Sequence, residues 1–172
     1  MRLFIAINLS EEERKQVLAV QNELKVKATR GNFTREENFH LTLAFLGEIP
    51  QTKVQVIEKV MDDASCGTFS LCFHKIDAFR RSGGSIYYLA AKPEEKAEKL
   101  SEYLRQTLSK RGFTMDDKRF VPHLTLGREI MMAKDETIHV LPITSDVTKI
   151  SLMKSERING TLTYTSIYEK ML

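Results

Sequence analysis

The alternation of apolar and polar residues predicts a chain rich in short strands. The first strand covers about residues 2–9, where Leu3, Ile5, Ile7 and Leu9 share one face. Further strands are predicted at about 38–46, 68–76, 86–91, 121–126, 147–154 and 161–168. Such strands bury one face and leave the other to solvent or to a ligand.

Apolar residues at helical spacing predict three helices between these strands. Ser10 and Glu13 form a capping box at the start of the first helix, which is expected to run to about Lys27. The second helix is marked by Val54, Ile57, Val60 and Ala64, and the third, which follows Pro93, by Leu100, Tyr103, Leu104 and Leu108. The stretch 130–146 is less regular, and no element is predicted in most of it.

The order of elements repeats at a constant offset of 83 residues. Residues 40–43 and 123–126 have the same sequence, His-Leu-Thr-Leu, and the same offset carries the first strand onto the strand at 86–91. We interpret this as an internal duplication with halves of about 1–82 and 83–172. The prediction is a single bilobal α+β domain, with two lobes related by a pseudo-two-fold axis and the glycine-rich turn at residues 80–85 between them.

Composition excludes several classes of protein. The chain has 172 residues, a formal net charge of +3, 42% hydrophobic and 28% charged residues. It is therefore neither a disordered chain nor a strongly basic protein that coats nucleic acid. The two cysteines, Cys66 and Cys72, are too few for a disulfide framework or a four-cysteine zinc site. No apolar stretch is long enough to span a membrane or serve as a secretory signal, so we expect a cytoplasmic location.

The repeated motif predicts the chemistry. On each strand the histidine and the threonine share one face, opposite the two leucines. If the two polar faces meet, His40, Thr42, His123 and Thr125 lie in one groove. Two imidazoles can act together as general acid and general base, and two hydroxyls can donate hydrogen bonds to the oxygens of a phosphate. This scheme requires no metal.

The paired motifs resemble those of the 2H phosphoesterase superfamily. The segments at 40–48 and 122–128 are most similar to the RNA 2′,3′-cyclic phosphodiesterases, also called 2′-5′ RNA ligases. The opening residues 2–7, and Leu152 to Ser155 with Tyr164 near the end, are similar as well. The resemblance implies a bilobal fold in which each lobe has an antiparallel sheet lining a central groove, with helices outside.

The same resemblance implies an activity and roles for residues. The activity is hydrolysis of a 2′,3′-cyclic phosphate at an RNA 3′ end to a 2′-phosphate, with a weak ATP-independent reaction that joins RNA ends through a 2′-5′ linkage. His40 is implied as the proton donor and His123 as the proton acceptor, while Thr42, Thr125 and Arg128 bind phosphate. RNA 3′ ends with a cyclic phosphate, tRNA fragments among them, are the implied partners. We expect a monomer with no cofactor.

Alternation along the strands carries two further expectations. From His123, strict alternation directs Arg128 to the opposite face, so its phosphate-binding role requires a bulge or a strand end near Gly127. From His40, the same alternation predicts that Phe45 is a core residue rather than a ring that stacks on a nucleobase. His74 and His139 have no matching motif and are expected to be structural.

The sequence also leaves other functions open and contains two pairs of basic residues. Two alternatives remain open: a related enzyme acting on a small cyclic nucleotide or an oligonucleotide tail, and a non-catalytic module that binds RNA or nucleotides. Arg80-Arg81 and Lys118-Arg119 are candidates for the groove mouth.

Overall fold

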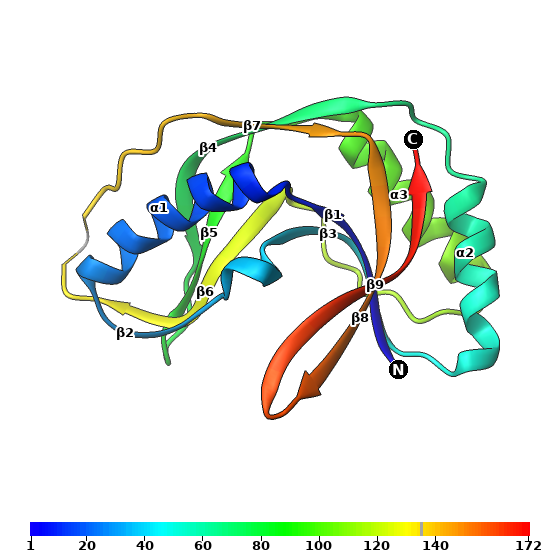
Figure 1. Ribbon diagram of the computed structural model, residues 1–172, viewed down its shortest axis with the longest axis horizontal. Coiled ribbons are helices and arrows are strands. Elements are labelled where there is room, and N and C mark those ends of the chain that lie inside the picture. The colour runs from blue at the N-terminus through cyan, green and yellow to red at the C-terminus, as the bar shows by residue number, and fades with distance from the viewer. Residues whose placement is uncertain (135) are drawn as a thin grey trace.

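The computed structural model describes residues 1–134 and 136–172. Helices lie among the strands in the first two thirds of the chain, and strands alone follow (Figure 1), close to the order that the periodicity predicts. The strands are β1 (Arg2–Asn8), β2 (Ala28–Phe33), β3 (His40–Glu48), β4 (Phe69–Phe79), β5 (Ser85–Ala91), β6 (His123–Met132), β7 (Ile143–Val147), β8 (Lys149–Ile158) and β9 (Thr161–Met171). The helices are α1 (Glu11–Lys27), α2 (Val54–Asp62) and α3 (Glu95–Lys110), with short 3₁₀ turns at Glu36–Asn38 and Gln51–Lys53.

The strands form one curled antiparallel sheet. Its order is β7-β4-β5-β6-β3-β1-β8-β9, with β2 paired to β6. The two central strands, β3 and β6, are joined at the Leu41–Leu124 pair. The predicted α+β architecture, with antiparallel strands around a central groove, is confirmed.

The sheet order is symmetrical about this central pair. β5 and β6 begin 83 residues after β1 and β3, and each pair lies at the same distance from the centre of the sheet. This symmetry supports the duplication, which remains a prediction. The spatial halves nevertheless take strands from both halves of the sequence, because β8 and β9 join β1 and β3. The turn at Gly83-Gly84 connects the neighbouring strands β4 and β5, so it does not separate the lobes as predicted.

The helices pack against the apolar face of the sheet. α1 lies over the half that contains β4 to β7, and α2 and α3 lie over the other half (Figure 1). The capping box of Ser10 and Glu13 is present at the start of α1, as predicted. Because Leu41, Leu43, Leu124 and Leu126 are all buried, the leucines of the repeated motif supply the core beneath the central strands.

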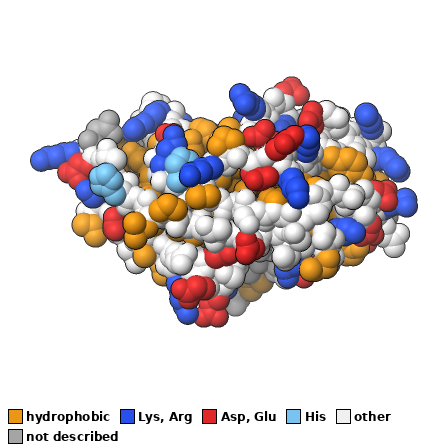
Figure 2. All heavy atoms as spheres, turned by 90° about the horizontal axis from the view of Figure 1, so that it is seen from above, with side chains coloured by type: hydrophobic (Ala, Val, Ile, Leu, Met, Phe, Trp, Pro, Cys, Tyr) orange, Lys and Arg blue, Asp and Glu red, His pale blue; other side chains and the backbone are white. Residues whose placement is uncertain are grey.

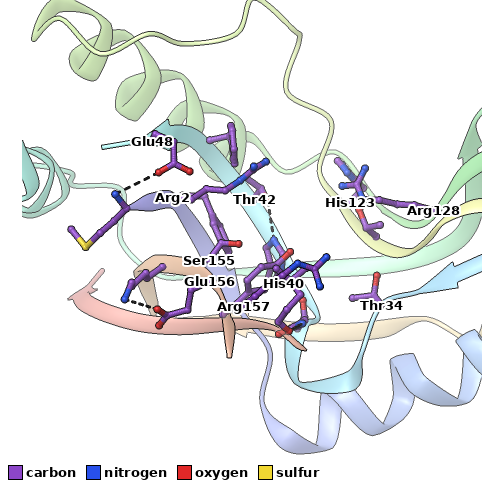
Figure 3. A pocket seen from close by; sticks show the side chains of 18 residues that line it. Arg2, Thr34, His40, Thr42, Glu48, His123, Arg128, Ser155, Glu156 and Arg157 are labelled. Carbon is purple, nitrogen blue, oxygen red and sulfur yellow. Dashed lines mark hydrogen bonds and ion pairs between the residues drawn. The ribbon is translucent and has the colours of Figure 1, made fainter. Parts of the chain in front are cut away.

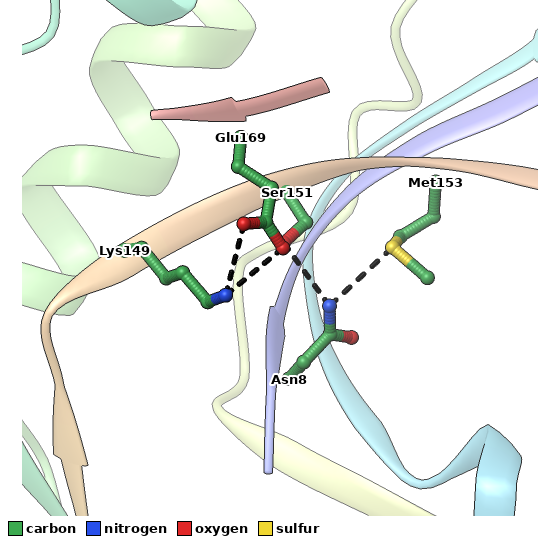
Figure 4. Close-up of polar contacts among 5 residues, drawn as sticks. All are labelled: Asn8, Lys149, Ser151, Met153 and Glu169. Carbon is green, nitrogen blue, oxygen red and sulfur yellow. Dashed lines mark hydrogen bonds and ion pairs between the residues drawn. The ribbon is translucent and has the colours of Figure 1, made fainter. Parts of the chain in front are cut away.

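Polar side chains make contacts between β1, β8 and β9. The Asn8 amide donates to the Ser151 hydroxyl at 3.1 Å, which gives this buried hydroxyl a partner (Figure 4). Nearby, Lys149 forms an ion pair with Glu169 at 2.9 Å between β8 and β9. Asn8 also pairs in register with His40, so these contacts position β1 beside the first motif.

Two strands differ from the sequence prediction. β2, which is not among the predicted strands, contains polar residues and Gly31, yet it pairs with β6. A Cβ atom at Gly31 would lie 2.6 Å from the Ile130 side chain, so glycine permits this close pairing. β7 lies inside the stretch 130–146 that was expected to be irregular, and residue 135 of that stretch lies outside the described residues. Both strands depend on partners far away in the sequence, which periodicity does not show.

Candidate active site

A groove of about 830 Å³ crosses the polar face of the central strands (Figure 3). All four motif side chains line it, as the sequence predicts, and Arg128 lines it as well. The other lining residues are Met1, Arg2, Phe4, Thr34, Asn38, Phe45, Glu48, Lys154, Ser155, Glu156, Arg157, Leu162 and Tyr164. Among the described residues, no group of three His, Cys, Asp or Glu side chains could hold a metal ion.

The two motifs meet where β3 and β6 run antiparallel. Leu41 pairs with Leu124, and the same register places His40 across from Thr125 and Thr42 across from His123. Each histidine therefore lies near the threonine of the other motif as well as near its own. The four polar groups converge because the two strands cross, although the motifs are 83 residues apart in the sequence.

Both imidazoles are oriented by a backbone carbonyl two residues earlier. His40 Nδ1 donates to the Asn38 carbonyl at 2.7 Å, and His123 Nδ1 donates to the Val121 carbonyl at 2.6 Å. This fixes the proton on Nδ1 in the neutral ring and leaves Nε2, toward the groove, as the ring nitrogen able to take up or release a proton. The Thr42 hydroxyl lies 3.0 Å from Nε2 of His40.

Aromatic rings pack around each histidine, and burial lowers its pKa. His40 lies 4.8 Å from the Phe4 ring and 5.2 Å from the Tyr164 ring, and His123 lies 5.1 Å from the Tyr88 ring. Burial lowers the pKa of His40 to about 4, against the opposing effect of its hydrogen bond to the Asn38 carbonyl. Burial also lowers the pKa of His123, and the charge of Arg128 adds to this. Both rings are therefore neutral in the free protein at neutral pH.

A β-bulge in each motif strand decides what else faces the groove. In the pairing of β1 with β3, the first residue after His40 without a partner is Leu43, and in the pairing of β5 with β6 the first after His123 is Leu126. A second irregularity follows in each strand, at Leu46 on β3 and at Arg128 and Glu129 on β6. The first extra residue in each strand reverses the alternation beyond it. Arg128 therefore turns toward the groove, as its predicted role required. Phe45 also turns there and is 45% exposed, so the prediction that it belongs to the core was wrong.

Several groove residues were missed by the sequence argument. Arg2 lies with its guanidinium 5.1 Å from the centre of the Phe45 ring. Its place in the groove follows from strand alternation, since Arg2 and Phe4 face away from the buried Leu3 and Ile5. Tyr164, which the family resemblance included without a role, packs edge-on against His40; strand alternation does not predict this contact, because β9 reaches the groove only through the sheet order.

Other residues singled out in the sequence lie elsewhere. His74 is on β4 and His139 is exposed in the connection before β7, and neither is among the groove residues. Lys118 and Arg119 line a separate hollow beside α3. Arg80 donates to the Tyr87 hydroxyl at 3.1 Å. On the face shown in Figure 2, basic and acidic side chains are interspersed, which agrees with the small net charge.

The fold and the site together define a phosphoester-processing class of protein, and comparison with known proteins gives the family. A model of the 2′-5′ RNA ligase superfamily matches residues 10–159, and the chain belongs to this family. The RNA 2′,3′-cyclic phosphodiesterase of Thermotoga maritima is 36% identical over 131 residues, which cover 74% of this chain and 70% of that protein. The protein of the same name from Archaeoglobus fulgidus is 33% identical over 133 residues, covering 74% and 72%.

Solved structures agree with this assignment. The structure of E. coli LigT complexed with 3′-AMP superposes with a TM-score of 0.86 at 26% sequence identity, covering 99% of this chain and 97% of that one. The resemblance noted from the two motifs and the predicted family are thereby confirmed. No helix among the described residues has the length and apolar character needed to cross a membrane.

Proposed function

We propose that this protein is an RNA 2′,3′-cyclic phosphodiesterase, which hydrolyses the cyclic phosphate at an RNA 3′ end to a 2′-phosphate. The observation that carries the proposal is the paired site: two imidazoles with Nε2 toward one groove, beside two threonine hydroxyls and Arg128. The names of the family relatives give the substrate class. A site with two titrating groups is more than phosphate binding alone requires, which favours an enzyme over a binding module.

In this mechanism the two histidines act on opposite sides of the phosphorus atom. His123 accepts a proton from water as the water oxygen forms a bond to phosphorus. His40 donates a proton to the 3′ oxygen as the bond between that oxygen and phosphorus breaks, which leaves a 2′-phosphate and a 3′-hydroxyl. The hydroxyls of Thr42 and Thr125 donate hydrogen bonds to the non-bridging oxygens, and Arg128 pairs with their charge. With a 5′-hydroxyl in place of water, the same steps produce a 2′-5′ linkage without ATP.

The remaining groove supports binding of the nucleotide. Phe45 offers an exposed aromatic ring for stacking on a base, and Arg2 adds positive charge beside it. Lys154 and Arg157 extend the groove along the hairpin of β8 and β9 and can contact further phosphates of an RNA chain. We therefore infer that an oligonucleotide end is a better substrate than a cyclic mononucleotide.

The test is a product assay in EDTA on a short RNA that ends in a 2′,3′-cyclic phosphate. The expected product is the 2′-phosphate alone, because only the 3′ oxygen departs. A cyclic mononucleotide, assayed in parallel, is expected to react with a lower kcat/KM. A 3′-phosphate product would contradict the proposed geometry. Preference for the mononucleotide would favour the alternative enzyme, and binding without turnover would favour the binding module.

The lowered pKa values predict an acidic profile for the reaction. One histidine must be charged and the other neutral. We therefore expect kcat/KM to decrease at pH values below the lower pKa and at pH values above the higher pKa. Since burial lowers the pKa of His40 to about 4 and that of His123 below its ordinary 6.5, the maximum should lie below pH 6.5. Above that pH, kcat/KM should fall about tenfold per unit. A profile that is flat from about pH 5 to 8, measured where chemistry limits the rate, would exclude this pair of roles.

The cytoplasmic location and the monomeric state belong to the same proposal. Cys66 and Cys72 are free thiols, as is usual in a reducing compartment. Both motifs of the groove lie in one chain, which supports a monomer.

A further inference from the structure

The bulges at Leu43 and Leu126 are held by buried polar side chains on helices outside the groove. An extra residue in a strand leaves backbone groups without partners in the ladder, and in the core these groups need other donors. The Leu126 carbonyl accepts from Gln21 Nε2 of α1 at 2.8 Å. The Leu43 carbonyl accepts from Ser101 Oγ of α3 at 2.7 Å. Both helix side chains are fully buried.

Gln21 makes a second contact that reaches the groove wall. The same amide nitrogen donates to the Thr34 carbonyl at 2.7 Å, and the Thr34 amide donates to the Leu126 carbonyl at 2.9 Å. Thr34 itself lines the groove. One buried amide thus ties the end of β2 to the bulge in β6. Its own oxygen has no hydrogen-bond partner, so Gln21 is placed for its donors and at some cost to the core.

The two contacts occupy matching places in the symmetrical sheet. Leu43 and Leu126 are the same position of the repeated motif, although the donors differ in type and come from different places on their helices. At each place the bulge turns the side chain two residues further along toward the groove. This side chain is Phe45 on β3 and Arg128 on β6. The position after Leu126 is also restricted, because a Cβ atom on Gly127 would lie 2.7 Å from the Ile130 side chain.

We propose that Gln21 and Ser101 are positioning residues: Gln21 holds the bulge that directs Arg128 into the groove, and Ser101 holds the one that directs Phe45 there. Neither helix residue lies among those that line the groove. The effect on substrate, which rests on the proposed function, is exerted through Arg128 and Phe45. Loss of either donor should therefore weaken substrate binding more than it slows the chemical step.

The test is a set of double-mutant cycles on kcat and KM. Gln21→Leu is expected to lower kcat/KM about tenfold, mainly through KM, and to lose most of this effect when Arg128→Ala is already present. Ser101→Ala should behave in the same way toward Phe45→Ala. The matched controls are the crossed pairs, Gln21→Leu with Phe45→Ala and Ser101→Ala with Arg128→Ala. In each crossed pair the effects of the two substitutions on kcat/KM should multiply. Multiplication in all four pairs, or single variants with unchanged KM, would overturn the proposal.

A crystal structure of the Gln21→Leu variant gives a result that does not depend on activity. The Arg128 side chain is expected to leave the groove, with the rest of β6 preserved. An unchanged Arg128 would overturn the proposal even if activity fell. If the wild-type protein had no activity on cyclic phosphates, the proposed function would fail while this structural result still decided the role of Gln21. If Gln21→Leu did not fold, Ser101→Ala, which removes only one oxygen atom, would test the same idea on the other strand.

Discussion

Replacing either groove histidine by alanine is expected to lower kcat on a cyclic phosphate-terminated RNA by about 10²–10⁴-fold. His40 and His123 are held alike by backbone carbonyls, with Nε2 toward the groove. Each variant removes one proton transfer, while the threonines and Arg128 remain to bind phosphate. Binding of an RNA with a 2′-phosphate end should therefore be largely retained, which separates a catalytic role from a binding role.

His139→Ala is the matched control for these variants. His139 is exposed and lies outside the groove, so its removal should leave kcat within about twofold. The double variant of His40 and His123 should be little worse than either single variant, because residues that act in one step are strongly non-additive. A groove variant that keeps more than about a tenth of the wild-type kcat would contradict the assignment.

Thr42→Val and Thr125→Val are expected to lower kcat by about 10²–10³-fold each. Valine has nearly the shape of threonine but no hydroxyl, so the change removes a donor to the phosphate with little effect on packing. The loss should appear in kcat more than in KM, because the hydroxyls face oxygens whose charge grows in the transition state.

Thr144→Val controls for the substitution itself. Thr144 is exposed on β7, away from the groove, and its loss should change neither kcat nor KM. If Thr42→Val or Thr125→Val raised KM alone and left kcat unchanged, the hydroxyls would bind substrate and transition state equally. That result would exclude a role of these hydroxyls in stabilising the transition state.

The sequence predicts local structure well where the pattern is strong. Leu3, Ile5 and Ile7 mark β1, and the capping box marks α1, because side-chain alternation and helix capping act within a few residues. β2 escaped prediction because its polar residues and Gly31 form a strand only when β6 lies beside them. The predicted division at Gly83-Gly84 failed for a similar reason, since strand order is a property of the whole sheet.

The sequence by itself determined the candidate residues for the chemistry. In each motif the histidine and the threonine lie on one face of the strand, and the buried leucines lie on the other. This arrangement depends only on local geometry. The tertiary structure alone decided that the two motifs cross as antiparallel neighbours, and that burial lowers the pKa of both histidines. It also decided that Arg128 and Phe45 face the groove. A bulge is stabilised by partners far away in the sequence, so alternation along one strand cannot reveal it.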